Sequence, residues 1–418
     1  MRRAAALSLL IAVLLGIGAP APAQPLWKRR IERLAARHRI GIAIEQDGRF
    51  LLSHRAGKRR VPASNQKLLT SMALLDTLGR AETFPTIAAA GRFESGVVRG
   101  DLWILGRGDP AVASKGQFAR SLPFPATGIR KLARRIAGAG ITRVRGRVMG
   151  SKGYFRHDWD APGWRSYYQS LYVALPSALT FKGNTHRGRH ILDPERLLAR
   201  ALTRRLRGLG VTVGHRAGSG YAPRAAAPLA RLESQPLSRL LRHMNRTSSN
   251  FFAEVLGKRL AVARFGAPGS IANAGRAIQR WAAARDLRVV AKDASGLSYR
   301  DRISARGLVR LLVRSESRPW GHAFKRSLAA AGQGTLKERL GGVRLRAKTG
   351  TLIEVSALAG WVWRRRHGSW ATFALLSRGM PKAEAAALED RIVRIVARSG
   401  PRPALRARVV GATHHPLA

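Results

Sequence analysis

Ser64 and Lys67, a serine and a lysine three residues apart, are suited by type and spacing to nucleophilic chemistry. Apolar residues recur at helical spacing after Ser64, and Gly79 is a natural stop, so the pattern predicts a helix that begins at Ser64. A serine there lies beside backbone N–H groups and the positive end of the helix dipole, and Lys67 projects from the same face. Lys67 could take the proton of Ser64 if its pocket favours the neutral amine. The alternative is a capping serine followed by a solvated lysine.

Two further polar clusters follow far along the chain. Ser248 and Asn250 lie in a short link between two predicted helices, where their side chains could either point into a cleft or cap the second helix. Lys348 and Thr349 end a predicted strand, and Gly350 allows another backbone to approach closely. The motifs S-x-x-K, S-x-N and K-T-G in this order are far more specific than any one of them alone.

The elements that must position these groups are strands from the two ends of the chain. Five segments are predicted as strands: 40–44, 49–54, 345–351, 357–363 and 370–376. Together they predict one antiparallel sheet with the Ser64 helix packed against it, which is an α+β fold. A further strand is expected at 287–291, between helices at 270–285 and 305–312.

The middle of the chain has a different texture. From about residue 86 it consists of short strands separated by glycine-bearing turns, until helical spacing returns near residue 237. We therefore expect a catalytic domain formed by 24–85 and 240–418, with an inserted region at 86–239. Residues 132–148 and 201–213 resemble each other as helix, glycine stop and strand, through either duplication or convergence.

The N-terminus has the pattern of a secretory signal peptide at residues 1–23. Arg2 and Arg3 precede an apolar run, and a small-x-small site precedes Gln24. We expect export across the inner membrane, to the periplasm. The sequence contains no cysteine, which excludes disulfides, thiol chemistry and a lipid-bearing cysteine.

The net charge of the chain is +53, from 76 Lys and Arg against 23 Asp and Glu. This excess is either a solvated arginine-rich surface or a means of attraction to an anionic wall or membrane surface. The basic residues are spread along the chain rather than gathered in a recognisable module, so we expect no nucleic-acid partner.

Several stretches resemble one known family. They are PASNQKLLTS (62–71), GDLWILGRGDP (100–110), APGW (161–164), MNRTSSNFFAEVLGK (244–258), DASGLSYRDRIS (293–304), GTLKERL (334–340) and AKTGTL (347–352). The sequence resembles the D-alanyl-D-alanine carboxypeptidases and endopeptidases, the low-molecular-mass class C penicillin-binding proteins. The resemblance implies the penicillin-binding/β-lactamase-like transpeptidase fold carrying a large inserted region. Such an insertion fits the long gap between Ser64 and Ser248.

The resemblance also implies the catalytic roles. Ser64 would be the acylated nucleophile, Lys67 its general base, and Ser248 a proton relay to the leaving group. The backbone N–H groups of Ser64 and Thr351 would form the oxyanion hole. No metal or cofactor would be needed.

The remaining roles concern binding of peptidoglycan stem peptides. By resemblance, Asn250 would hold the substrate amide and Thr349 the terminal carboxylate. Lys348 would supply positive charge that favours a neutral Lys67. β-Lactam antibiotics would act as inhibitors by acylating Ser64.

Two positions depart from the family pattern. Ser249 stands where the family usually has Asp, a side chain expected to be structural. Ser151 and Lys152 stand where an acidic residue often holds the amino group of the stem peptide, so the side-chain preference stays open. The balance of carboxypeptidase and endopeptidase activity is also open. The alternatives are a non-catalytic wall-binding protein and a β-lactamase-like member of the same fold.

Overall fold

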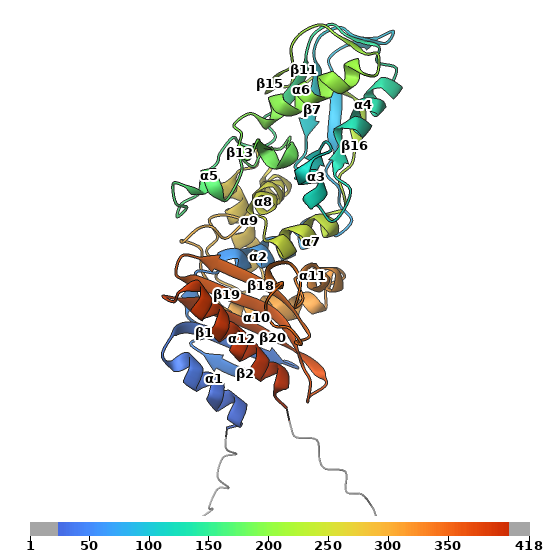
Figure 1. The fold of residues 1–418 in the computed structure, drawn as a ribbon. Coiled ribbons are helices and arrows are strands. Elements are labelled where there is room, and N and C mark those ends of the chain that lie inside the picture. The colour runs from blue at the N-terminus through green and yellow to red at the C-terminus, as the bar shows by residue number, and fades with distance from the viewer. Residues whose placement is uncertain (1–23, 401–418) are drawn as a thin grey trace, which may run out of the picture.

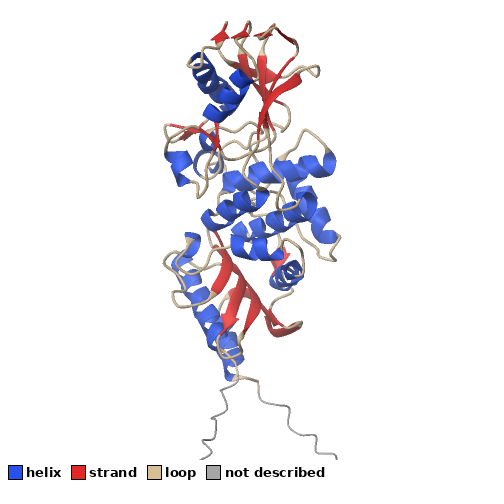
Figure 2. Ribbon diagram, turned by 90° about the vertical axis from the view of Figure 1, so that its right-hand side faces the viewer, coloured by secondary structure: helices blue, strands red, loops and turns tan. Residues whose placement is uncertain are grey.

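The protein is elongated, with sheets at both ends and helices between them (Figures 1 and 2). The computed structural model describes residues 24–400. The predicted signal peptide, residues 1–23, lies outside the described residues. Within 24–400, no helix combines the length and the apolar character that a bilayer crossing requires.

One end of the molecule contains a five-stranded antiparallel sheet in the order β18-β19-β20-β1-β2. Its strands are β1 (Arg39–Gln46), β2 (Arg49–His54), β18 (Leu345–Leu352), β19 (Val355–Arg364) and β20 (Ser369–Arg378). A turn at Asp47 and Gly48, both with positive φ, joins β1 to β2. The α+β class and the antiparallel five-stranded sheet predicted from the sequence are confirmed.

Helices cover both faces of this sheet. Ile42 and Ile44 of β1 pack into a core with α1 (Leu26–Ala36) and α12 (Lys382–Arg398). Ala43, between them, points the other way into the core around α2. Two further helices, α10 (Ala305–Glu316) and α11 (Gly321–Ser327), pack on this second side.

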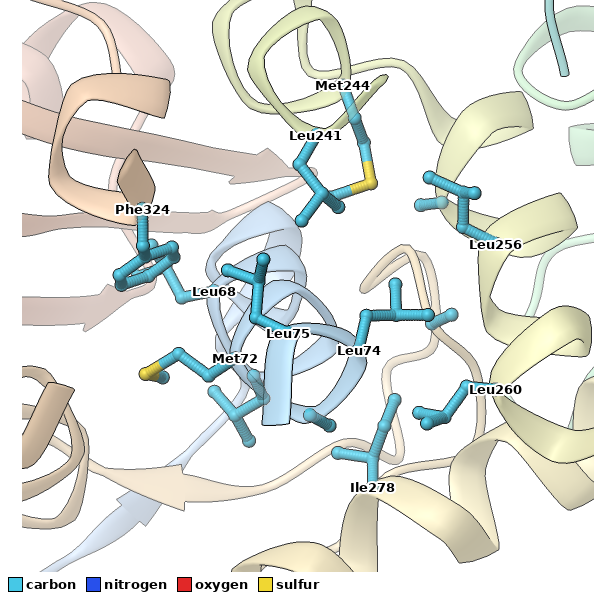
Figure 3. Close-up of a cluster of buried hydrophobic side chains, with 14 of the residues drawn as sticks. Leu68, Met72, Leu74, Leu75, Leu241, Met244, Leu256, Leu260, Ile278 and Phe324 are labelled. Carbon is cyan, nitrogen blue, oxygen red and sulfur yellow. The ribbon is translucent and has the colours of Figure 1, made fainter. Parts of the chain in front are cut away.

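Helix α2 (Gln66–Leu78) lies at the centre of the molecule. It is surrounded by the sheet and by α7 (Leu237–Thr247), α8 (Asn250–Phe265) and α9 (Ile271–Ala283). Every residue from 66 to 75 is buried, and the apolar side chains point outward in several directions into this core (Figure 3). The helix ends at Gly79, whose φ is 80°, as the sequence predicted.

The prediction that this helix begins at Ser64 was wrong by two residues. Ala63–Asn65 form a single 3-10 turn, in which the N–H of Asn65 donates to the carbonyl of Pro62 at 3.1 Å. Ala63 has a φ of +46°, which is uncommon for a residue with a Cβ atom. This tight turn places Ser64 just ahead of the α-helix.

The prediction of a strand at 287–291 was also wrong. Only one residue there, Val290, forms a bridge, and its partner is Arg302. The next two N–H groups bond to side chains instead: Ala291 donates to Gln279 Oε1 at 3.2 Å and Lys292 to Asp301 Oδ1 at 2.7 Å. Because side chains satisfy these donors, no ladder extends from the bridge.

The other end of the molecule is the inserted region, which has two larger sheets and the two-stranded pairs β8-β9 and β12-β13. The larger, in the order β15-β11-β7-β4-β16, contains β4 (Thr86–Ala90), β7 (Leu102–Gly106), β11 (Val148–Lys152), β15 (Gly218–Tyr221) and β16 (Ala227–Leu232). The smaller, β14-β10-β6-β5, contains β5 (Phe93–Glu94), β6 (Val97–Val98), β10 (Arg143–Val144) and β14 (Thr212–Val213). The main helices of the inserted region are α4 (Ile129–Gly138) and α6 (Pro194–Arg207).

Short elements complete the chain. They are β3 (Arg59–Arg60), β8 (Val112–Ala113), α3 (Gln117–Ser121), β9 (Thr127–Gly128), α5 (Tyr168–Leu171), η2 (Lys182–Asn184), β12 (Thr185–His186), β13 (Arg189–His190), β17 (Ile303–Ser304) and η3 (Gly334–Leu336).

The two similar segments of the inserted region lie side by side. Each runs helix, strand, strand, and β10 pairs with β14 and β11 with β15, both in parallel. The region enters and leaves through paired strands, because Thr86 at the start of β4 lies opposite Leu232 at the end of β16. We propose the division predicted from the sequence, with 86–239 inserted into a catalytic domain of 24–85 and 240–418.

Candidate active site

Two of the three sequence motifs, and the residue that follows the third, line one cavity of about 670 Å³. Its lining includes Ser64 from the 3-10 turn, Ser248 and Asn250 from the link between α7 and α8, and Thr351 from β18. Residues separated by almost three hundred positions in the chain are therefore brought together as the sequence predicted. The rest of the lining is mostly apolar or aromatic: Tyr167, Tyr168, Tyr172, Leu297, Leu352, Ile353, Glu354, Gly379, Met380, Pro381 and Lys382.

Lys67 lies fully buried beneath Ser64. Its Nζ is 2.9 Å from Ser64 Oγ, 2.8 Å from Asn250 Oδ1 and 2.7 Å from the carbonyl oxygen of Ser295. Burial lowers the pKa of Lys67 to about 7, and the carboxylates of Asp293 and Glu254 oppose that shift. A substantial fraction of Lys67 is therefore neutral at neutral pH and within reach of the Ser64 hydroxyl.

A second lysine–serine pair lies on the other side of the cavity. Ser248 follows α7 with a φ of +58°, and its Oγ accepts a hydrogen bond from Lys348 Nζ at 2.8 Å. Lys348 also donates to the carbonyl of Thr349 at 2.7 Å. It is fully buried, and both burial and the nearby charge of Lys67 hold its pKa well below the usual range for lysine.

Asn250 is the first residue of α8 and bridges two parts of the structure. Its Oδ1 accepts from Lys67, and its Nδ2 donates to the carbonyl of Tyr172 at 3.0 Å. The neighbouring Ser249 caps the helix, because its side chain accepts from the N–H of Phe252 at 3.2 Å. The residue that departs from the family pattern thus has a structural contact.

Two threonines of β18 differ in their position. Thr351 is exposed and lines the cavity, whereas Thr349 is half-buried and its Oγ1 donates to Thr335 Oγ1 at 2.7 Å. The role of Thr349 in carboxylate binding stays a prediction. Between them, a Cβ atom on Gly350 would lie 2.8 Å from the carbonyl of Pro62, so only glycine lets β18 approach the Ser64 turn this closely.

The sequence analysis missed two buried carboxylates beside this site. Glu254 lies four residues after Asn250, on the same side of α8, and that spacing could have identified it. Burial and the charge of Asp293 raise the pKa of Glu254 to about 8. Asp293 begins the DASGL stretch, whose contact with Lys67 depends on tertiary structure. Among residues 24–400, no group of three His, Cys, Asp or Glu side chains is arranged to hold a metal ion.

Ser151 and Lys152 lie away from the Ser64 cavity. They line a separate cavity of about 290 Å³ with Glu195 and Tyr221, and Lys152 Nζ is 3.8 Å from Asp193 Oδ1. Among the described residues, the two cavities share no lining side chain. The stem-peptide preference that depends on this position stays open.

The chain matches the D-Ala-D-Ala carboxypeptidase 3 (S13) family over residues 30–189 and 183–399, which is most of its length. The chain belongs to this family. The family resemblance seen in the sequence is thereby confirmed.

Two curated relatives cover about three quarters of the chain. A carboxypeptidase of Mycobacterium tuberculosis is 31% identical over 76% of this chain and 71% of the relative. A D-alanyl-D-alanine carboxypeptidase of Actinomadura sp. is 26% identical over 75% of this chain and 73% of the relative.

Solved structures show the same fold at lower identity. Penicillin-binding protein 4 of Haemophilus influenzae has a TM-score of 0.74 and 17% identity, and the match covers 88% of this chain and 99% of that one. A second structure of the same protein, in complex with a β-lactam, has a TM-score of 0.66 and 19% identity over 87% and 98%. The penicillin-binding protein fold with a large inserted region is therefore confirmed.

Proposed function

We propose that this S13-family enzyme is a D-Ala-D-Ala carboxypeptidase that cleaves peptidoglycan stem peptides through an acyl-enzyme on Ser64. The observation that carries the proposal is the 2.9 Å contact between Ser64 Oγ and the buried Nζ of Lys67 at the cavity floor. The names of the two curated relatives support the same activity. Cleavage of cross-links between D-Ala and a diamino acid would use the same chemistry.

In the acylation step, Lys67 accepts the hydroxyl proton of Ser64 while Oγ bonds to the carbonyl carbon of the penultimate D-alanine. The N–H groups of Ser64 and Thr351 stabilise the oxyanion. The C–N bond then breaks and Ser248 passes a proton to the leaving nitrogen. The net result moves the Ser64 proton to the released D-alanine, and water later hydrolyses the ester.

The binding groups surround this reaction centre. Asn250 holds the substrate amide, and Thr349 receives the terminal carboxylate on the Lys348 side of the cavity. Lys348, when it is protonated, disfavours a second charge on Lys67 and so adds to the effect of burial, which keeps the base neutral. β-Lactams acylate the same serine and inhibit the enzyme, and the β-lactam complex of the Haemophilus protein supports this assignment.

The first prediction tests the nucleophile. Ser64→Ala should abolish covalent labelling by a fluorescent penicillin, because no other atom takes the place of Oγ. The unfolding temperature should change little, because the Ser64 hydroxyl caps neither the 3-10 turn nor α2, and its hydrogen bond with Lys67 contributes about 1 kcal/mol. Labelling that persists in Ser64→Ala would remove Ser64 as the nucleophile.

We also propose a periplasmic location and electrostatic contact with anionic wall or membrane surfaces. The +53 charge supports this contact. Two adjoining cavities of the inserted region, about 310 and 330 Å³, have five Lys or Arg residues and no carboxylate among their described lining residues. Those basic residues are Lys115, Arg130, Lys182, Arg204 and Arg205.

A further inference from the structure

Lys67 can act as a base toward Ser64 only if its lone pair points at Oγ. A neutral amine has two N–H donors and one lone pair. Lys67 has three neighbours, and two of them, Asn250 Oδ1 at 2.8 Å and the Ser295 carbonyl at 2.7 Å, accept hydrogen bonds from it. When both acceptors are in place they occupy both N–H groups, and the lone pair is left for the Ser64 hydroxyl.

The Ser295 carbonyl is held by a loop, residues 293–298, that two buried carboxylates brace. Glu254 Oε1 accepts from the N–H groups of Ser295 at 2.8 Å and Ala294 at 3.1 Å. Asp293 accepts from the N–H groups of Gly296 at 2.6 Å and Ser298 at 2.8 Å. Both side chains are fully buried, so breaking any of these bonds would leave a buried polar group unpaired, which holds the loop in place.

The same loop is fastened to the inserted region. Asp293 Oδ2 accepts a third hydrogen bond, at 2.6 Å, from the indole Nε1 of Trp164. Ser298 Oγ donates to the carbonyl of Pro162 at 2.6 Å, and the N–H of Tyr299 donates to Gly163 at 3.1 Å. The turn at 161–164 therefore holds the loop that carries the Ser295 carbonyl.

Asn250, the other hydrogen-bond acceptor of Lys67, is also bonded to the inserted region. Asn250 Nδ2 donates to the carbonyl of Tyr172, which also belongs to the inserted region. This bond fixes which end of the Asn250 amide faces Lys67. Both acceptors that orient the amine are thus connected to the 86–239 segment.

We propose that the inserted region completes the general base, with Trp164 and Asp293 acting as positioning residues that set the orientation of Lys67 through the Ser295 carbonyl. The inference rests on the proposed function, in which Lys67 deprotonates Ser64. It gives the inserted region a role in the chemical step itself.

The charged groups that face Lys67 come from several elements. Asp293 lies on the bracing loop, Glu254 on α8 and Lys348 on β18. Asp301 is buried behind Asp293 and bonds to the N–H of Lys292. The charge of Asp293 raises the pKa of Lys67, because it favours the protonated amine. Its hydrogen bonds to the loop act separately, because they hold the Ser295 carbonyl that orients Lys67.

The test compares two Trp→Phe variants that lose the same kind of bond. Trp164→Phe removes the indole donor to Asp293, and Trp281→Phe removes an indole donor to the half-buried carboxylate of Asp76, 2.9 Å away at the far end of α2. We expect Trp164→Phe to lower the first-order acylation constant for a chromogenic β-lactam about tenfold, as the loss of a hydrogen bond to a charged group implies. The dissociation constant of the non-covalent complex should change by no more than about twofold. Trp281→Phe should leave both constants unchanged.

A pH profile separates positioning from general loss of structure. Asp293→Asn removes a charge that raises the pKa of both Lys67 and Glu254, so the midpoint of acylation against pH should shift while the plateau also falls. A variant that is only partly folded would lose activity equally at every pH, with the midpoint unchanged. Active-site titration with a labelled β-lactam gives the folded fraction.

The outcomes are distinct. Equal acylation constants in Trp164→Phe and Trp281→Phe, with wild-type acylation intact, would overturn the inference and leave the proposed function standing. Failure of the wild-type protein to acylate at all would overturn the proposed function. If Trp164→Phe does not fold, Ser298→Ala, which loses the bond to the Pro162 carbonyl and the bond from the Arg300 N–H, should show a smaller fall of the same constant. An unchanged constant there would count against the inference.

Discussion

In the proposed mechanism, Lys67 makes acylation sensitive to pH. Its pKa of about 7 lies far below the ordinary lysine value of 10.5, because burial disfavours the charged amine. Below the pKa the amine carries a proton and cannot accept another, and above it the neutral amine can. We predict that the acylation rate rises with pH around a midpoint near 7, measured with a chromogenic β-lactam in buffers of constant ionic strength. A midpoint near 10 would contradict the assignment of Lys67 as the base.

Lys67→Arg is the matched control at this position. Arginine keeps the positive charge and the donors but does not give up its proton at physiological pH. Acylation should fall by about 10²–10⁴-fold, the usual contribution of a general base, and no rise near pH 7 should remain. Near-normal acylation by the arginine variant would rule out proton transfer to Lys67.

Helix α8 presents Asn250 to the cavity, and Ser249 holds the start of that helix. Ser249→Asp keeps an oxygen that can accept from the N–H of Phe252, so both stability and acylation should stay close to wild type. Ser249→Ala loses this cap and should reduce the free energy of unfolding by about 1 kcal/mol. The measurements are thermal unfolding and penicillin acylation of the two variants. A large loss of acylation in Ser249→Ala at full folding would show that Ser249 acts in catalysis.

The sequence predicted most elements of the catalytic domain because their signals are local. The turn at Asp47 and Gly48 and the apolar strands on either side gave the first hairpin with the bounds of β2 correct. The start of the Ser64 helix was misplaced because the left-handed Ala63 and its 3-10 turn arise from packing against Gly296, where an added Cβ atom would lie only 1.9 Å from the Ala63 carbonyl. Contacts between residues more than two hundred positions apart leave no local pattern.

The contrast between local signals and long-range contacts also applies to the active site. Ser64, Lys67 and Ser248 were predicted as catalytic because the motifs that carry them are short and ordered, and the structure brings their side chains together at one cavity or beneath it. Their roles stay predictions. Asp293 and Trp164 were not assigned to the site, because the effect we propose for them passes through backbone atoms of a loop. A backbone carbonyl such as that of Ser295 has no sequence signature at all.

At the scale of the whole molecule, the surplus of basic residues should govern adsorption and leave the chemistry alone. Ionic attraction to a surface is screened over about 8 Å at 0.15 M salt. We predict that retention on sacculi or anionic vesicles falls steeply from low to high salt. Acylation of the purified enzyme by a neutral β-lactam should change only slightly over the same range. A joint collapse of retention and acylation would place the charge in the active site or the fold instead.

The pairing of the strands also orders the events of folding. The inserted region closes on itself at the β4–β16 pair, so all its strands are available once the chain has been made as far as Leu232. The β1–β2 hairpin, by contrast, pairs with β20, which is synthesised more than three hundred residues later. The edge of β1 opposite β2 stays unpaired until then. Until the last strands arrive, β1 exposes unpaired backbone groups that can join other chains. In a chain that is not yet complete, β1 is therefore a strand edge open to pairing with other chains.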